Sequence, residues 1–333
     1  MKIYILSHTD LDGYFSGGLA QAFLETQHLG AEFKHKSWTY GRDIPNLENI
    51  KNTYDMFVLV DLCLDTEYMN YLIENFGENF IWIDHHIKPD TLFLENAVSK
   101  NFKYKTAEKE HTDAACALVW KYFSDDSISV PYWLKLISDF DCWNRDDESY
   151  WQNEVMPMYS FMKAKVTTPE EAYNFIAKEL YPRIKLAKNR ISYFCSDSIV
   201  TEELEIGKYM YLSTKKMYEV DCKHGFPAEL EVCLDRYNSE EKTKIKAWVC
   251  NTQNRSSVIF ESHPNRDNYD VFIPYHFNGK KYYYSMYTFK HGEIFCNRIR
   301  VFYNDFMFED FNGHDDAAGC NSDNFFIIPI NKD

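Results

Sequence analysis

The sequence lacks any long hydrophobic run. No apolar stretch approaches the roughly 20 residues that a helix needs to cross a bilayer. The chain also opens on strand-like residues from Lys2, without the basic segment and following apolar segment of a secretory leader. We therefore expect a cytoplasmic protein that has no membrane partner.

The sequence is also poor in positive charge and in paired cysteines. It has 36 Lys and Arg against 51 Asp and Glu, a formal net charge of −15, which disfavours a protein that neutralises many phosphates of a long nucleic acid. The nine cysteines are odd in number and include no Cys-x-x-Cys pair, so we expect reduced thiols rather than a disulfide framework. A small anionic substrate is compatible with this composition, whereas a long duplex nucleic acid is not.

What the sequence does have is length and a large apolar fraction. Its 333 residues with 45% hydrophobic content suffice for two domains, each with a core. We expect an α/β fold in which residues 1–165 form a parallel-sheet domain, because strand-like runs alternate there with helical patterns. A helical connector is expected at residues 166–202, followed by a smaller α/β domain at residues 203–333.

Local signals place individual helices within this plan. One helix is expected after Gly13 to about Thr26, a second from an N-cap at Thr112, and a third from Pro131 to about Ser138.

The connector helix has a stronger start signal, because Thr168 can cap it, Pro169 suits its first position and Glu171 lies three residues after the cap. Pro182 is expected to kink or break this helix. Beyond about Glu203 we expect strands, with an Asn278-Gly279 hairpin turn between the last two. The expected strands are Tyr209–Leu212, Leu230–Leu234, Ile245–Cys250, Val258–Glu261, Val271–Tyr275 and Tyr282–Tyr287.

Three apolar runs end in carboxylates and imidazoles. Residues 2–6 lead into His8-Thr9-Asp10-Leu11-Asp12-Gly13, residues 56–60 into Asp61, and residues 80–83 into Asp84-His85-His86. Open α/β sheets bind their ligands at the carboxyl ends of the strands, and mixed imidazole and carboxylate donors suit Mn²⁺, Fe²⁺, Co²⁺ or Zn²⁺ better than Ca²⁺. For any one residue a helix cap or a core histidine is an equally good interpretation. Their joint occurrence at three strand ends instead indicates a metal site.

Taken in order along the chain, these motifs resemble the DHH/DHHA1 phosphoesterases, a family that includes nanoRNases (oligoribonucleases), cyclic-dinucleotide phosphodiesterases and the exonuclease RecJ. Two further segments carry the resemblance: Ser138-Asp139-Phe140-Asp141-Cys142-Trp143, and Gly313-His314-Asp315-Asp316-Ala317-Ala318-Gly319 near the carboxyl end. The short first motif and the Asp-x-Trp of the fourth are most similar to the nanoRNases. The resemblance implies a DHH metal-binding domain at residues 1–165 and a DHHA1-type substrate-binding domain at residues 203–333.

The resemblance also implies a centre of two divalent ions, with Mn²⁺ as the expected metal. Two such ions can clamp the attacking and leaving oxygens of a phosphoryl displacement and make hydroxide available at neutral pH. One ion would be held by His8, Asp10 and Asp61, and the other by Asp12, Asp61, His85 and Asp141, with Asp61 bridging both. His86 would face the scissile phosphate, and Asp84 would orient a histidine from behind.

The fourth motif offers two carboxylates, Asp139 and Asp141, which on a strand would face the same side. Asp141 is the preferred ligand and Asp139 the runner-up, since the family's aspartate precedes a small residue and then an aromatic one, as in Asp141-Cys142-Trp143.

In the second domain, Gly313, His314, Ala317, Ala318 and Gly319 resemble the loop with which the family grips the far end of its substrate. This chain departs from the family in two places: Glu309-Asp310-Phe311-Asn312 replace a run of glycines, and Tyr287 stands where a phosphate-binding arginine is usual. Arg298 or Arg300 could supply the missing guanidinium, although a solvated face of a helix from Glu293 to Tyr303 is the favoured interpretation of both.

The expected function is a metal-dependent phosphodiesterase that hydrolyses short oligonucleotides to mononucleotides. Cyclic dinucleotides and bisphosphonucleosides are alternative substrates for the same centre. A nucleotide-binding sponge or sensor without turnover is the alternative from another class, although the complete set of ligands argues against it. The sequence leaves RNA versus DNA, cleavage polarity and homodimer formation open.

Overall fold

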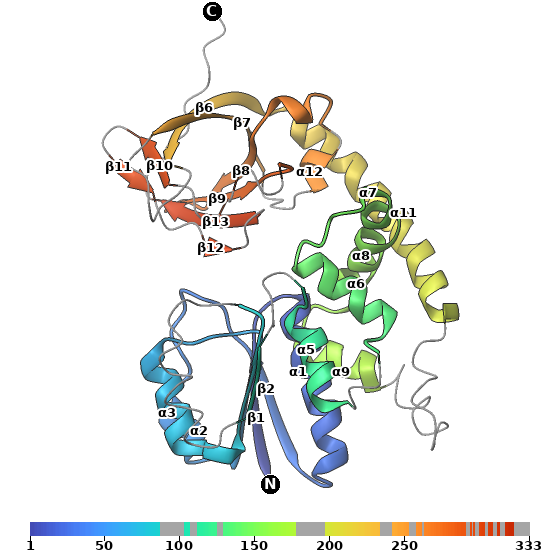
Figure 1. The fold of residues 1–333 in the computed structure, drawn as a ribbon, viewed down its shortest axis with the longest axis vertical. Helices are drawn as coiled ribbons and strands as arrows, with labels where there is room; N and C mark the ends of the chain where they lie inside the picture. Colours follow the sequence, from blue (N-terminus) through green and yellow to red (C-terminus); the bar gives the residue numbers. More distant parts are fainter. Residues whose placement is uncertain are drawn as a thin grey trace, which may run out of the picture. The chain divides into compact units, whose positions relative to one another are not determined.

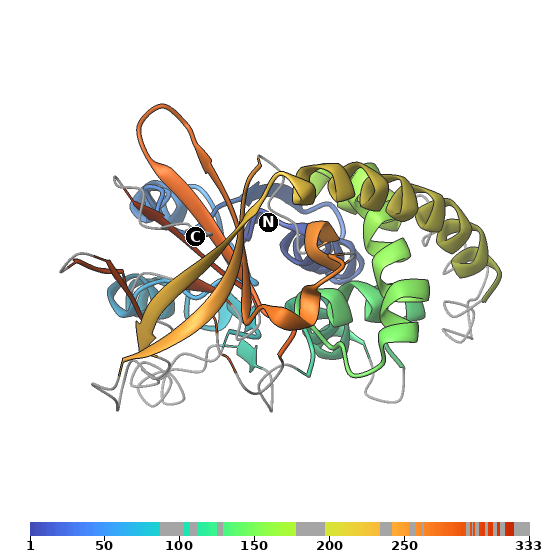
Figure 2. The ribbon, with the colours of Figure 1, turned by 90° about the horizontal axis from the view of Figure 1, so that it is seen from above.

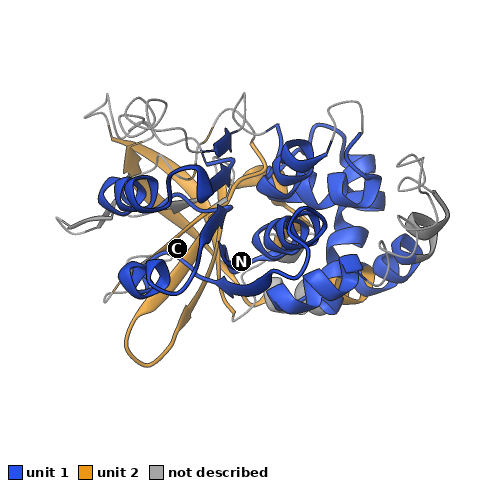
Figure 3. Cartoon of the chain, turned by 90° about the horizontal axis from the view of Figure 1, so that it is seen from below, with its two compact units in different colours: residues 1–211 blue, residues 212–333 orange. Residues whose placement is uncertain are grey.

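The computed structural model describes residues 1–86, 103–106, 112–124, 129–177, 197–233, 242–252, 258–261, 263–290, 294, 296, 300–303, 306–308, 312–313 and 317–322. The chain forms two compact units, residues 1–211 and residues 212–333 (Figure 3). The predicted functional boundaries at residues 165 and 203 stay a prediction, because contacts within a unit do not say where a connector begins.

The first unit is built on a five-stranded parallel sheet with the order β2-β1-β3-β4-β5. Its strands are β1 (Lys2–Ser7), β2 (Glu32–Ser37), β3 (Met56–Val60), β4 (Phe80–Asp84) and β5 (Lys103–Thr106). Every residue of β3 and β4 is buried, whereas exposure alternates along β2 at the sheet edge. Continuous apolar runs belong to strands that are covered on both faces, which confirms the predicted parallel α/β fold.

Helices cover both faces of this sheet (Figure 1). On one face lie α2 (Leu47–Lys51) and α3 (Thr66–Phe76), whose apolar side chains join a buried cluster with β3 and β4. On the other lie α1 (Leu11–Gln27), α5 (Ala115–Phe123) and α9 (Pro169–Phe175). The unit also contains α6 (Tyr132–Asp141), α7 (Glu148–Tyr150), a π-helical turn at Trp151–Val155, α8 (Met156–Lys165) and a 3₁₀ turn at Gly77–Asn79.

The second unit holds a mixed eight-stranded sheet with the order β11-β10-β6-β7-β8-β9-β13-β12, which is strongly twisted (Figure 2). Its strands are β6 (Phe226–Cys233), β7 (Thr243–Asn251), β8 (Val271–Phe277), β9 (Tyr282–Tyr287), β10 (Arg300–Tyr303), β11 (Phe306–Phe308), β12 (Asn312–Gly313) and β13 (Ala317–Ser322). The short α12 (Val258–Glu261) and a 3₁₀ turn at Arg266–Asn268 interrupt them, and α11 (Asp197–Lys223) crosses the division between the units. None of the described helices is long and apolar enough to cross a bilayer.

Two local predictions are confirmed by hydrogen bonds. Thr168 caps α9, because its hydroxyl accepts from the N–H of Glu171 at 3.2 Å, and Pro169 occupies the first turn. The Asn278-Gly279 turn joins β8 and β9 as an antiparallel hairpin, in which the Asn278 side chain accepts from the N–H groups of Lys280 and Lys281.

Four local predictions are wrong. The segment Tyr209–Leu212 lies inside the 27-residue helix α11, where a long helical context overrides the strand preference of tyrosine. Val258–Glu261 forms one helical turn whose Phe260 is buried against Phe272. Residues 300–303 form a strand instead of a helix, because this apolar and aromatic segment pairs with both β6 and β11. Thr112 does not cap α5, which begins three residues later. Pro182 lies outside the described residues.

Candidate metal centre

The strand order locates the functional edge of the first unit. In a sheet of order 2-1-3-4-5 the connections leave β1 and β3 in opposite directions, and ligands bind at the carboxyl ends of strands beside that switch point. His8 and Asp10 follow β1, and Asp61 follows β3 directly. The sheet topology thus brings together residues that lie about fifty positions apart in the chain.

The loop after β1 is shaped by the start of α1. Asp10 is the N-cap of this helix, because its Oδ1 accepts from the N–H of Gly13 at 2.9 Å, and its Oδ2 lies 2.5 Å from His8 Nδ1. A side chain at residue 13 would place Cβ 2.4 Å from the carbonyl oxygen of His8, so only glycine fits. Burial raises the pKa of Asp10, but the bond and charge of His8 outweigh it and lower the value to about 2.

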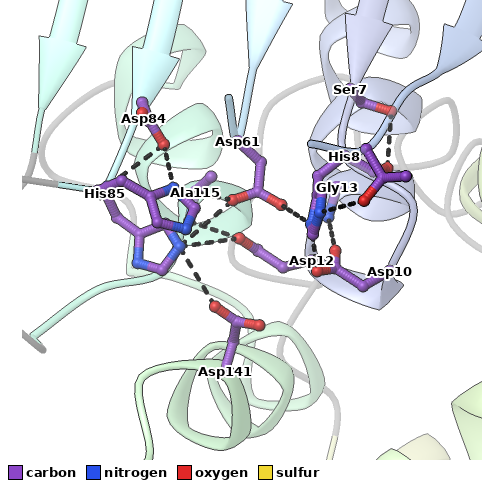
Figure 4. A network of polar contacts seen from close by, with 12 residues as sticks. Ser7, His8, Asp10, Asp12, Gly13, Asp61, Asp84, His85, Ala115 and Asp141 are labelled. Atoms are coloured by element: carbon purple, nitrogen blue, oxygen red, sulfur yellow. Dashed lines mark hydrogen bonds and ion pairs between the residues drawn. The ribbon is translucent and has the colours of Figure 1, made fainter. Parts of the chain in front are cut away.

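Asp61 is held in an uncommon backbone conformation between the two sides of the cluster. Its φ is +56°, in the left-handed region, and its N–H donates to the carbonyl of Ile83 at 2.9 Å. Both carboxylate oxygens are buried and have no hydrogen-bond donor among the described residues. Oδ2 lies 3.8 Å from His8 Nδ1, and Oδ1 lies 3.3 Å from His85 Nε2. Asp61 therefore faces both sides, as Figure 4 shows.

The Asp84-His85-His86 motif sends its two imidazoles to different partners. The Nδ1 of His86 lies 2.7 Å from Asp84 Oδ1, so the Asp84 carboxylate contacts the imidazole of His86. Burial lowers the pKa of His86, but Asp84 outweighs it and raises the value to about 9. The pKa of His85 is lowered by burial and by His86. The two rings differ in exposure, 32% for the side chain of His86 and 5% for that of His85.

The fourth motif lies at the carboxyl end of α6, where the structure separates its two carboxylates. Asp141 Oδ2 is 3.2 Å from His85 Nε2. Asp139 instead accepts from Lys135, from Tyr150 and from Asn144, and it belongs to no group of possible ligands among the described residues. Consecutive helical residues are about 100° apart around the axis, so two positions separate the side chains instead of aligning them. The geometry therefore favours Asp141, the residue preferred from the sequence.

The described residues contain three overlapping groups whose ligand atoms lie within 4.8 Å of one another: His8, Asp10 and Asp61; Asp61, His85 and His86; and Asp12, His85 and Asp141. The carboxyls repel each other: burial and the charges of Asp12 and Asp10 raise the pKa of both Asp61 and Asp141. Bound cations would offset this charge. With the buried, undonated oxygens of Asp61, the donor set fits two divalent ions that share that residue.

The sequence analysis did not identify the residues that contact the candidate ligands. Asp12 accepts from the N–H groups of Ala115 and Cys116 at 2.9 and 2.8 Å, more than a hundred positions away. The sulfur of Cys142 lies 3.9 Å from His85 Nδ1, whereas Nε2 is the ring nitrogen that faces Asp61 and Asp141. A hydrogen bond at the second ring nitrogen is how histidine ligands are commonly oriented. No spacing signal announces contacts of this kind.

The predicted substrate residues of the second unit are placed only in part. Gly313 in β12 pairs with Ala318 in β13, and Tyr287 in β9 pairs with Ala317. Tyr287 is thus the direct ladder neighbour of the segment Ala317–Gly319. Arg300 lies in β10, with four strands between it and β13 in the sheet order. His314 and Arg298 lie outside the described residues.

The fold and the cluster together define a parallel α/β domain with a site for divalent cations at its switch point. Residues 2–138 match the model of the DHH family, N-terminal domain. This match covers the amino-terminal part of the chain and supports phosphoric ester hydrolysis as the class of chemistry at the site.

The chain is also similar to several solved structures. An uncharacterized protein from Helicobacter pylori G27 shares 15% identity, with 98% of this chain and 94% of that chain covered and a TM-score of 0.32. RecJ in complex with Mn²⁺ from Thermus thermophilus shares 13% identity with a TM-score of 0.46. The match covers 96% of this chain and 49% of the RecJ chain. PggH, a pGpG-specific phosphodiesterase from Vibrio cholerae, shares 10% identity over 96% and 92%, TM-score 0.43. No curated protein matches the sequence.

Proposed function

We propose that the protein is a metal-dependent phosphodiesterase that hydrolyses short oligonucleotides to mononucleotides. The observation that carries the proposal is the position of Asp61, whose two buried oxygens face His8 on one side and His85 on the other. Two divalent ions bound there would polarise a phosphoryl group and supply the nucleophile at neutral pH. The mixture of imidazole and carboxylate donors suits Mn²⁺, Fe²⁺, Co²⁺ or Zn²⁺ better than Ca²⁺, and we propose Mn²⁺ among these from the resemblance of the motifs to the DHH/DHHA1 phosphoesterases.

The protein's own residues hold and orient the ester. A doubly protonated imidazole donates from both nitrogens. His86 can therefore keep Nδ1 on Asp84 and present Nε2 to a phosphate oxygen. His86 is also the more exposed imidazole of its motif, as a group that meets substrate must be.

The short length of the proposed substrate follows from charge. A chain with a net charge of −15 can neutralise few phosphates outside the centre itself. We assign the remainder of the substrate to the segment Gly313–Gly319 with His314, Ala317 and Ala318, and we keep Arg298 and Arg300 as candidate phosphate donors. Tyr287, the ladder neighbour of Ala317, offers a hydroxyl and a ring in place of the guanidinium.

A substrate panel tests this proposal. It contains a 5′-phosphorylated dinucleotide, a short oligoribonucleotide, cyclic dinucleotides and a bisphosphonucleoside, each incubated with the protein and Mn²⁺. Asp141→Asn is the inactive control, because it removes a carboxylate from the centre, whereas a change at Asp12 would also disturb the start of α5.

Release of mononucleotides from the linear substrates, lost in Asp141→Asn, is the expected result. Selective opening of cyclic dinucleotides, or dephosphorylation of the bisphosphonucleoside, would move the activity to that substrate class. Binding without turnover across the panel would overturn the enzyme and favour a nucleotide-binding sponge.

A further inference from the structure

The first turn of α5 is capped by residues from elsewhere in the fold. Its N-cap residue, Ala114, has no side chain that can accept a hydrogen bond. Three successive backbone N–H groups instead donate outward: Ala114 to the hydroxyl of Ser138 at 2.8 Å, Ala115 to Asp12 Oδ2 at 2.9 Å, and Cys116 to Asp12 Oδ1 at 2.8 Å. The orphan donors of this helix start are therefore satisfied by α1 and α6.

These three hydrogen bonds are buried. Ala114, Ala115 and Cys116 are fully buried, and Asp12 and Ser138 are 1% and 2% exposed. Water cannot replace a lost partner at such depth, so each bond strongly constrains the groups that it joins. The α5 start thus fixes α1 and α6 against each other at one point.

Both attachment points belong to the metal centre or adjoin it. Asp12 lies in the first turn of α1 and groups with His85 and Asp141. Ser138 lies three positions before Asp141 on α6, and residues three apart share a helix face. The turn of α6 that carries Asp141 is therefore tied to the N–H group adjacent to those that hold Asp12.

The attachment also sets the orientation of Asp12. Each of its oxygens accepts one backbone N–H, which fixes the carboxylate plane, while Oδ2 still lies 3.8 Å from His85 Nε2. The carboxylate lies at the positive end of the α5 dipole, which attracts negative charge. This matters where Asp61 and Asp141 already crowd the same space with like charge.

We propose that the start of α5, together with Ser138, is the positioning element of the Asp12–His85–Asp141 group, and that Ser138 is a positioning residue for the ion held there. The inference rests on the proposed function, because it concerns an ion of the same centre. The test of this inference measures metal binding, so its result does not depend on turnover.

The test is Mn²⁺ titration by calorimetry, with Ser138→Ala as the variant. Supporting groups behind ligands typically change metal affinity by about 10-fold or more. We expect Ser138→Ala to weaken one of two Mn²⁺ binding steps about tenfold and leave the other unchanged. Ser138→Thr keeps the hydroxyl and should restore most of the affinity.

Ser16→Ala is the matched control. Ser16 is a fully buried serine of α1, and its hydroxyl has no hydrogen-bond partner among the described residues. Its replacement should leave both Mn²⁺ steps unchanged. Hydrogen exchange of the metal-free protein adds a second readout: the peptide that contains Ala114–Cys116 should exchange faster in Ser138→Ala and at the parent rate in Ser16→Ala.

The outcomes separate the two proposals. Parent affinity at both steps in Ser138→Ala, in a protein that hydrolyses phosphodiesters, overturns the positioning role alone. Equal weakening by Ser138→Ala and Ser16→Ala also overturns it, since the effect would then be general softening of the fold. A parent protein that binds no Mn²⁺ overturns the proposed function, and the inference with it.

Discussion

The two halves of the metal centre differ in how they are built. The first half, His8 and Asp10, comes from nearby positions in one loop and is partly open, with side-chain exposures of 22% and 41%. The second half, Asp12, His85 and Asp141, comes from α1, the end of β4 and α6, and the first two of its side chains are 0% and 5% exposed. Asp61 joins the halves.

The first half is built from residues that are close in the sequence, whereas the second half is built from residues that the fold brings together. The first half needs only a strand, a capped helix start and Gly13, all of which lie within a few residues. The second half also needs α5 to hold Asp12. We therefore expect the second half to be the more rigid and the tighter ion site, because pre-ordered ligands lose less freedom on binding.

Replacing the residue that joins the halves should have the largest effect. Asp61→Asn keeps a side chain that tolerates the left-handed φ of +56°, but it removes the shared charge. The loss of several kcal/mol of transition-state stabilisation corresponds to a decrease in kcat of about a thousandfold. Both Mn²⁺ affinities should fall together in calorimetry.

A change in only one Mn²⁺ step would contradict the bridging position of Asp61. Asp61→Ala is the companion variant, since alanine lacks the side-chain amide that helps asparagine adopt a positive φ. Asp61→Ala should lose activity as Asp61→Asn does, and it should also unfold at a lower temperature than Asp61→Asn.

The comparison shows what the sequence could predict. Strand ends that carry Asp61 and Asp84-His85-His86 are visible because apolar runs and their terminal residues are local, and the sheet order then brings them together. Asp139 and Asp141 could not be separated from spacing alone, because the answer depends on α6 extending to Asp141. Local propensity predicts Thr112 as the cap of α5, whereas the acceptors are Ser138 and Asp12, which no local pattern can reveal.

A buried histidine in β2, the strand that pairs with β1, allows a test by pH. His35 in β2 lies 2.9 Å, through Nε2, from the hydroxyl of Ser7, and burial lowers its pKa to about 4. The unfolded chain protonates this histidine near pH 6.5 and the folded chain near pH 4, so acidification favours unfolding across that window. The parent should lose up to about 3 kcal/mol of unfolding free energy between these values from this group.

The measurement is chemical denaturation of the metal-free protein at several pH values from about 4 to 8, which spans both states of the histidine. His35→Gln should show a flatter dependence between pH 6.5 and 4, because glutamine does not titrate. An equal slope in both proteins would show that His35 is not kept neutral by the fold.

Asp12 and Asp141 offer a matched pair within the second half. Both Asp→Asn changes remove one carboxylate from the same group. In Asp12→Asn, however, an amide NH₂ replaces an oxygen that faces a backbone N–H of α5. A buried donor without an acceptor costs about 1–3 kcal/mol, so metal-free Asp12→Asn should be less stable than metal-free Asp141→Asn by about that amount.

Denaturant unfolding in the presence of a chelator measures this difference without any contribution from bound ions. Equal stability of the two variants would mean that α5 does not depend on Asp12 for its cap. The result also decides which variant can serve as an inactive control with an intact fold, and the hydrogen bonds favour Asp141→Asn.

The smallest expected effect is a difference in ion release between the halves. If the open half holds its ion about tenfold less tightly, a separation of roughly 1.4 kcal/mol, increasing chelator should remove the two Mn²⁺ ions in two steps. His8→Gln should abolish the weaker step and retain the tighter one, because His8 belongs only to the group with Asp10 and Asp61 among the described clusters. Free Mn²⁺ followed by electron paramagnetic resonance reports each step directly. Simultaneous release of both ions would mean that Asp61 couples the two ion sites strongly. The difference in how the two halves are built would then produce no difference in their Mn²⁺ affinities.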